Sequence, residues 1–313
     1  MSCSSNPGRA PPVRVDGRKL TISGTSLFFK GVAWSPYNLS YSPNLGHRPD
    51  YVGFAALDAK LMQAASINVV RTYEAIGDVS VLDELWSHGI GVVMTIFLDA
   101  GYGHSVATAL ATVCTLKQHP AVLMWAVTNE PNYYSVSSTY MSDISTVVAA
   151  IKAEDSTRPV AVVWGEVASA SVVNALPEVD VWGFNIYRGT SFTDLWTVWP
   201  SVSSKPFFIA EYGTDSYTGS ADTFSRQASE VAMMATEVAS QAVATGDGPC
   251  IGGVLFSFAD EWWKYSSGAA DQHNTIPSWT AGGGYNDLAI QEEHLLLTTY
   301  YLLLTTYCRW RIQ

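Results

Sequence analysis

Residues 122–130 read VLMWAVTNE, a run that changes from wholly apolar to polar at its last three positions. Its first six residues include β-branched and aromatic side chains without polar alternation, which is typical of a strand buried on both faces. We identify seven further runs of this kind, at 26–34, 67–73, 91–99, 159–165, 179–187, 206–213 and 251–260. The chain is therefore predicted to contain eight strands of a parallel α/β fold.

Helix-like stretches lie between many of these runs. They are found at 54–66, 78–89, 106–119, 141–155 and 224–243. No proline- or glycine-rich linker divides the middle of the 313-residue chain, and this length suits one α/β barrel. We predict a single (β/α)8 TIM barrel over residues 19–290 rather than two smaller domains. An N-terminal tail is expected at 1–18, and a C-terminal tail, which contains LLLTTY twice and receives no function, at 291–313.

The composition limits the classes of partner. The net charge of −11 opposes binding to phosphate backbones, so nucleic acid is not an expected partner. No apolar run reaches the length needed to span a bilayer, so we expect no membrane insertion. Neutral glycans suit this surface better, and the 11 Trp and 16 Tyr residues could stack on sugar rings or simply fill a large core.

The spacing of the cysteines, histidines and aspartates indicates neither a metal site nor a redox site. The four cysteines, Cys3, Cys114, Cys250 and Cys308, match no zinc or redox motif. An even number of cysteines permits disulfides without showing them. No group of histidines and aspartates has metal-ligand spacing, so we expect neither a metal nor another cofactor.

Two glutamates occupy the positions where a barrel places its chemistry. Active residues of such barrels lie at the carboxyl ends of the strands. Glu130 ends the run at 122–130, and Glu211 lies near the end of the run at 206–213. Cleavage of a glycosidic bond needs two carboxyl groups, one protonated to assist the departing oxygen and one ionised to attack the anomeric carbon. The alternative is a pair of structural acids that are ion-paired with arginines.

The motifs around these glutamates resemble a known group of enzymes. HPAVLMWAVTNEP (119–131) and AEYGTDS (210–216) are similar to the acid/base and nucleophile strands of glycoside hydrolase family 2. GVAW (31–34) and VLFSFAD (254–260) resemble its first and eighth barrel strands. The wider clan A of retaining glycoside hydrolases includes the fungal β-1,3-glucanosyltransferases, which the chain resembles more loosely. This resemblance implies a retaining enzyme with Glu130 as acid/base and Glu211 as nucleophile.

Three further polar residues receive roles by their position at strand ends. Arg71 could hold the nucleophile ionised through a charge-assisted hydrogen bond, a role that the resemblance also implies. Asn129 could donate to the 2-hydroxyl of the substrate, and Tyr187 could orient Glu211. The structural alternatives are a salt bridge for Arg71, a turn contact for Asn129 and simple packing for Tyr187.

Several aromatic residues are candidates for sugar contacts. Phe256 stands where family 2 commonly has a sugar-stacking tryptophan. The other candidate platforms, each of which could instead pack in the core, are Trp34, Tyr133, Trp262 and Trp263.

Together these features predict double displacement on a β-linked glycan by a hydrolase or transglycosylase. For the substrate we expect a β-glucan, with a β-1,3 linkage favoured by the glucanosyltransferase-like features. The alternatives are a retaining enzyme of the β-mannanase, β-galactosidase or β-glucuronidase type, or a non-catalytic carbohydrate-binding barrel. We expect a monomer that takes an oligo- or polysaccharide, and favour a secreted or cell-wall-associated location.

Overall fold

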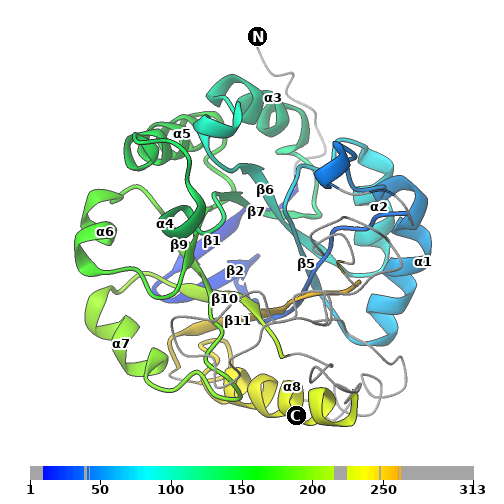
Figure 1. Ribbon diagram of the computed structural model, residues 1–313, viewed down its shortest axis with the longest axis vertical. Coiled ribbons are helices and arrows are strands. Elements are labelled where there is room, and N and C mark those ends of the chain that lie inside the picture. The colour runs from blue at the N-terminus through cyan, green and yellow to red at the C-terminus, as the bar shows by residue number, and fades with distance from the viewer. Residues whose placement is uncertain are drawn as a thin grey trace.

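The computed structural model describes residues 10–38, 41, 43–214, 224–246, 248–259 and 261. Its centre is a closed barrel of eight parallel strands in the order β10-β11-β4-β5-β6-β7-β8-β9 (Figure 1). The strands are β4 (Phe29–Ala33), β5 (Val69–Thr72), β6 (Gly91–Phe97), β7 (Val122–Val127), β8 (Val160–Gly165), β9 (Val181–Asn185), β10 (Phe207–Tyr212) and β11 (Cys250–Leu255). Each lies within or overlaps one of the eight predicted runs, and the predicted TIM barrel is confirmed.

Helices surround the barrel and connect successive strands (Figure 1). They are α1 (Tyr51–Ala64), α2 (Val79–Ser87), α3 (Val106–Leu116), α4 (Pro131–Tyr134), α5 (Tyr140–Glu154), α6 (Ala170–Ala175), α7 (Leu195–Val202) and α8 (Phe224–Ser240). Two short 3-10 helices occur at Pro43–Leu45 and Ala100–Tyr102. All five predicted helices are present. None of the helices among the described residues is long and apolar enough to cross a membrane.

The core has an inner and an outer part, because successive side chains of a strand point to opposite faces. In β4, Phe29 and Ala33 belong to the inner hydrophobic cluster, whereas Val32 and the following Trp34 belong to the outer one. Trp34 is fully buried there and donates its indole N–H to Asp58 of α1, at 2.8 Å. The expectation that Trp34 offers a platform to a sugar is therefore wrong, because its faces are covered by protein.

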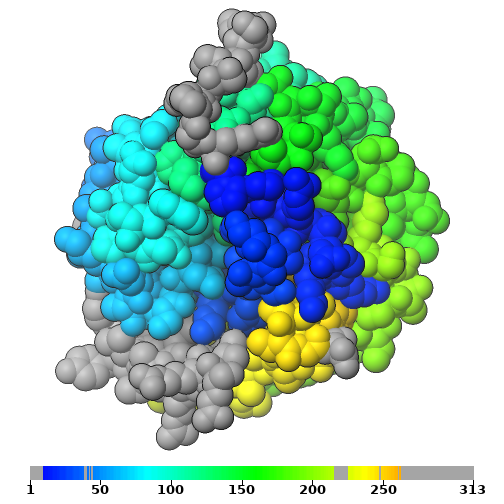
Figure 2. Space-filling model, turned by 180° about the vertical axis from the view of Figure 1, so that it is seen from behind, coloured from blue at the N-terminus to red at the C-terminus, as the bar shows by residue number. Residues whose placement is uncertain are grey.

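The amino-terminal end of the barrel is closed by a small antiparallel sheet. Its strands are β1 (Val13–Asp16), β2 (Lys19–Ile22) and β3 (Thr25–Ser26). Val13 and Leu20 are buried in the inner cluster, and Figure 2 shows the first described residues lying across the centre of this face. Residues 13–16 thus form a paired strand within the segment that we expected to be a tail, because the two turn residues Gly17 and Arg18 fold β1 back onto β2.

The opposite, carboxyl end of the barrel is where the candidate catalytic residues gather. The C-terminal tail expected at 291–313, including both copies of LLLTTY, lies outside the described residues, as do Trp262 and Trp263.

Candidate active site

A buried arginine joins four strand ends at the mouth of the barrel. Arg71 on β5 has no exposed surface. Its Nη1 donates to Glu211 Oε1 at 2.7 Å and to the carbonyl oxygen of Ala210 at 3.1 Å. Its Nη2 donates to Asn129 Oδ1 at 2.6 Å, and Nη1 also lies 3.5 Å from Asn185 Oδ1. The guanidinium group therefore links β5 with the ends of β7, β9 and β10.

Glu211, the candidate nucleophile, is 6% exposed and surrounded by hydrogen-bond donors. Besides Arg71, the hydroxyl of Tyr73 donates to Oε1 at 2.7 Å and that of Tyr187 donates to Oε2 at 2.9 Å. An ionised carboxylate is an acceptor only, so three donors match its charged form. Burial and the charge of Glu211 raise the pKa of Tyr73 well above its usual value, which keeps Tyr73 a donor.

An irregularity in β10 turns Glu211 toward this arginine. Phe208 and Ala210 belong to the inner cluster and Ile209 to the outer one, so strict alternation would point Glu211 outward. The pairing register of β10 shifts against β9 between Ile209 and Glu211, and against β11 on both sides of Ile209. Such bulges re-aim side chains and are common beside active sites.

Glu130, the candidate acid/base, is joined to the same network by an amide. Asn185 at the end of β9 donates Nδ2 to Glu130 Oε1 at 2.9 Å and to Asn129 Oδ1 at 3.2 Å. A continuous chain of contacts therefore runs from Glu130 through Asn185 and Arg71 to Glu211. This chain connects the two carboxyl groups at one mouth.

The backbone after β7 is folded tightly to present Glu130. Thr128 and Glu130 have positive φ angles of 72° and 52°, which are uncommon outside glycine. The backbone N–H of Thr128 donates a hydrogen bond to the carbonyl of Phe97 at 2.5 Å, and its hydroxyl donates to the carbonyl of Val163 at 2.9 Å. The N–H of Glu130 donates to the same carbonyl of Val163, at 3.2 Å. Residues in such regions cost on the order of 1–3 kcal/mol each and persist where their surroundings determine them.

Asn129 presents its amide nitrogen for a further contact. Its Oδ1 accepts from both Arg71 and Asn185, so the amide orientation is set by two donors. No hydrogen bond from its Nδ2 to any described residue is found. The contact of Asn129 with a substrate hydroxyl stays a prediction.

The remaining residues that were predicted to contact the substrate differ in how far they are buried. Tyr187 reaches Glu211, as noted above. Phe256, directly after β11, is 4% exposed and meets Tyr73 edge-on, with ring centroids 6.2 Å apart, so its ring packs against Tyr73 rather than offering a face to a sugar. Tyr133 is largely exposed on α4, immediately after Glu130.

Tyr73 and Asn185 are site residues that the sequence analysis missed. Each lies two positions from a residue that was chosen, Tyr73 from Arg71 and Asn185 from Tyr187. Since side chains two apart on a strand share a face, this spacing could have revealed both.

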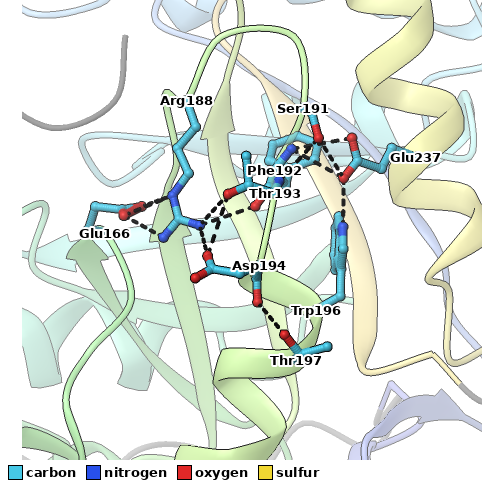
Figure 3. Close-up of polar contacts among 9 residues, drawn as sticks. All are labelled: Glu166, Arg188, Ser191, Phe192, Thr193, Asp194, Trp196, Thr197 and Glu237. Carbon is cyan, nitrogen blue, oxygen red and sulfur yellow. Dashed lines mark hydrogen bonds and ion pairs between the residues drawn. The ribbon is translucent and has the colours of Figure 1, made fainter.

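The segment that carries Tyr187 is held from two sides (Figure 3). Arg188 forms an ion pair with Glu166, after β8, and another with Asp194, with N–O distances of 2.6 and 2.7 Å. Glu237 on α8 accepts from the indole of Trp196 at 2.7 Å and from the N–H of Phe192 at 3.2 Å. The loop between β9 and α7, which includes Tyr187, is therefore held by contacts on both sides.

Comparisons with known proteins point to glycoside hydrolases. A family model described as "Glycosyl hydrolases family 2, TIM barrel domain" matches residues 102–238. A beta-glucuronidase of Rattus norvegicus is 30% identical over 229 residues, which cover 66% of this chain and 34% of that protein. A beta-glucuronidase of Sus scrofa is 26% identical over 231 residues, with the same coverage. The chain thus spans about a third of the length of these curated relatives.

Solved structures show the same fold. A Ruminococcus gnavus beta-glucuronidase superposes with a TM-score of 0.66 at 15% identity, covering 95% of this chain and 54% of that one. A GH2 beta-galacturonidase from Eisenbergiella tayi, bound to galacturonate, gives a TM-score of 0.65 at 17% identity, covering 96% and 54%.

Fold and site together resemble a TIM barrel of the retaining glycosidase class. Over residues 102–238, the barrel is similar to the TIM barrel domain of glycoside hydrolase family 2.

Proposed function

We propose that the protein cleaves β-linked glycosides with retention of anomeric configuration. The observation that carries this proposal is the continuous contact chain from Glu130 through Asn185 and Arg71 to Glu211. The two carboxyl groups have different partners within it. Glu211 accepts hydrogen bonds from a cation and two phenols, whereas Glu130 accepts one from the neutral amide of Asn185. This asymmetry suits a nucleophile and a proton donor, respectively.

The reaction proceeds in two displacements. In the first, a Glu211 oxygen bonds to the anomeric carbon while the bond to the leaving oxygen breaks and that oxygen takes the proton of Glu130. In the second, Glu130 removes a proton from water, or from another sugar, as the new oxygen displaces Glu211. Oε1 accepts from both Arg71 and Tyr73, whereas Oε2 accepts from Tyr187. We assign the attack to Oε2, because fewer donors draw on its lone pairs.

Asn129 contributes to binding in the transition state. Its amide nitrogen faces away from Arg71 and Asn185, whose donors occupy its oxygen. A hydrogen bond from this amide to the 2-hydroxyl would strengthen as charge develops on the sugar ring.

Two observations bear on which sugar the protein accepts as glycone, and they favour different compounds. The curated relatives are named beta-glucuronidases, and one structural neighbour is named a beta-galacturonidase, which makes uronides the first compounds to test. The expected β-glucan substrate has no support from these comparisons. However, Arg48, Arg71 and Arg188 are all ion-paired with acidic residues, which leaves neutral glycones in the test as well.

The proposal predicts that the first product formed is the β-anomer. The test supplies aryl β-glucuronide, β-galacturonide, β-glucoside, β-galactoside and β-mannoside, together with a β-1,3-glucan. Proton NMR then follows the anomeric signal of the best substrate before mutarotation. Initial appearance of the α-anomer would mean an inverting enzyme, and saturable binding without turnover of any compound would mean a carbohydrate-binding barrel.

Replacement of Arg71 by methionine is expected to lower kcat more than it raises KM. Loss of a charge-assisted hydrogen bond to a buried carboxylate costs about 2–3 kcal/mol, or roughly 30- to 150-fold in rate.

The matched control is Arg18→Met at the opposite end of the barrel. Arg18 donates to the backbone carbonyls of Ser203 and Lys205, so its loss should lower the melting temperature and leave kcat and KM unchanged. A folded Arg71→Met protein with the native kcat would reduce Arg71 to a structural role.

A further inference from the structure

Three exposed tyrosines form an aromatic surface beside Glu130. Tyr102, Tyr133 and Tyr134 are 56%, 57% and 44% exposed, respectively, although large aromatic side chains usually bury most of their area. Tyr133 and Tyr134 are neighbours with ring centroids 6.1 Å apart, and the hydroxyl of Tyr102 donates to the carbonyl of Tyr134 at 2.8 Å. We call these three residues the tyrosine surface.

The turn that carries Tyr133 and Tyr134 is anchored to the barrel. The side-chain amide of Asn132 makes two hydrogen bonds with the backbone of Gly165 at the end of β8, donating to its carbonyl at 2.8 Å and accepting from its N–H at 2.9 Å. Ser135, which follows α4, donates its hydroxyl to Asp99. The rings of Tyr133 and Tyr134 therefore project from a fixed turn, which lies inside the ring of outer helices in Figure 1.

Gly165 makes room for the ring of Tyr133. A Cβ atom at Gly165 would lie 2.3 Å from Cε2 and 2.5 Å from Cδ2 of Tyr133, far inside van der Waals contact. One side of the ring thus rests against the end of β8 while more than half of the residue faces solvent. A ring that is held along its Cδ2–Cε2 edge and is otherwise largely exposed is suited to stacking.

The surface lies on the side from which Glu130 acts. The N–H groups of Tyr133 and Tyr134 both donate to the carbonyl of Glu130, at 2.9 and 3.0 Å, so rings and carboxylate extend from one turn. Burial, followed by the charges of Glu166 and Glu130, raises the pKa of Tyr133, which is consistent with its hydroxyl lying near both carboxylates. In a retaining glycosidase the acid/base faces the leaving oxygen, so whatever that oxygen carries is released on this side.

We infer that Tyr133 forms the wall of a leaving-group subsite, which takes a ring attached to the scissile oxygen. This inference rests on the proposed function. The preferred substrate is then a β-glycoside whose leaving group is a second pyranose or an aryl ring rather than a small alkyl group. The same wall would hold an incoming sugar when transfer replaces hydrolysis.

The test compares Tyr133→Ala with the native chain on three compounds that share the glycone identified by the substrate panel. The glycosyl fluoride has no leaving-group ring and needs no proton. The dinitrophenyl glycoside has a ring and needs no proton, and the β-linked disaccharide has a ring and needs the proton of Glu130. The measured quantity is kcat/KM, which covers every step up to formation of the glycosyl-enzyme.

Loss of stacking should lower kcat/KM by roughly tenfold, about 1.4 kcal/mol, for both ring-bearing compounds and leave the fluoride unchanged. Tyr133→Phe should retain most of the activity, because the ring face does the binding. Gly165→Ala, which displaces the ring without removing it, should show the same selectivity if its melting temperature shows that it is folded. The control is Trp86→Ala, at an exposed aromatic residue on α2, which should leave kcat/KM unchanged for all three compounds.

Other patterns would overturn the inference. A loss confined to the disaccharide would mean that Tyr133 positions Glu130 for proton transfer, and an equal loss or no loss on all three compounds would exclude a leaving-group wall. Failure of the native protein to turn over any of the three would instead count against the proposed function, so the two failures are distinguishable.

Discussion

Replacement of Glu211 by alanine is expected to abolish turnover of natural glycosides. Loss of the nucleophile from a covalent mechanism typically costs on the order of 10⁴- to 10⁶-fold in kcat. Sodium azide should restore part of the activity on a dinitrophenyl glycoside, because a small anion fits the space of the missing carboxylate and also supplies a charge partner for the buried Arg71. The product of this rescue is the α-glycosyl azide, since a single displacement inverts the anomeric centre.

The effect of Glu211→Ala must be separated from loss of folding. Breaking a buried ion pair leaves its partner uncompensated and costs about 3–5 kcal/mol, so the melting temperature should fall. Asp83→Ala, at a carboxylate on the outer surface of α2, provides a matched control and should keep the native rate. A folded Glu211→Ala protein with near-native turnover would remove this residue from the mechanism.

Replacement of Glu130 by alanine is expected to give a loss that depends on the leaving group. General acid catalysis contributes roughly 10²- to 10⁴-fold to the rate, so cleavage of glycosides with a sugar leaving group should slow by that factor. Formation of the glycosyl-enzyme from a dinitrophenyl glycoside needs no proton and should continue. Its hydrolysis needs the base, so the intermediate should accumulate and appear as a burst of dinitrophenol. Azide should accelerate this second step and yield the β-glycosyl azide.

The opposite configurations of the two azide products assign the two glutamates independently of rate. If Glu130→Ala gave the α-azide and Glu211→Ala the β-azide, the roles would have to be exchanged. A uniform loss on all leaving groups for Glu130→Ala, in a protein with the native melting temperature, would exclude proton donation by this residue.

The barrel was predictable because its strands are buried on both faces. Runs such as VLMWAVTNE have no polar alternation, and eight of them leave few architectures open. The short helices α6 and α7 were missed because six and eight residues contain too few turns to show a period, and α7 includes Pro200. The strand β1 was missed because its alternating VRVD pattern lies next to a polar, proline-containing segment.

Within the site, the residues named from strand ends lie close together, whereas two of the expected aromatic platforms, Trp34 and Phe256, are buried. Arg71, Asn129, Tyr187 and the two glutamates meet in one network, whose geometry supports their proposed roles. The prediction for Trp34 was wrong because side chains alternate along the strand, and this alternation turns Trp34 outward, against α1. The inward turn of Glu211 depends on a shift in strand pairing, which a single sequence does not reveal.

The small sheet at the amino-terminal end of the barrel has a practical consequence for handling the protein. Its strands lie across the face opposite the mouth, so the chain enters the barrel on the side away from the glutamates (Figure 2). A protein coupled to a solid support through its N-terminal side would present the mouth to the bulk solution. Immobilised preparations made in this orientation should therefore still process insoluble or polymeric glycosides that cannot reach a mouth turned toward the support.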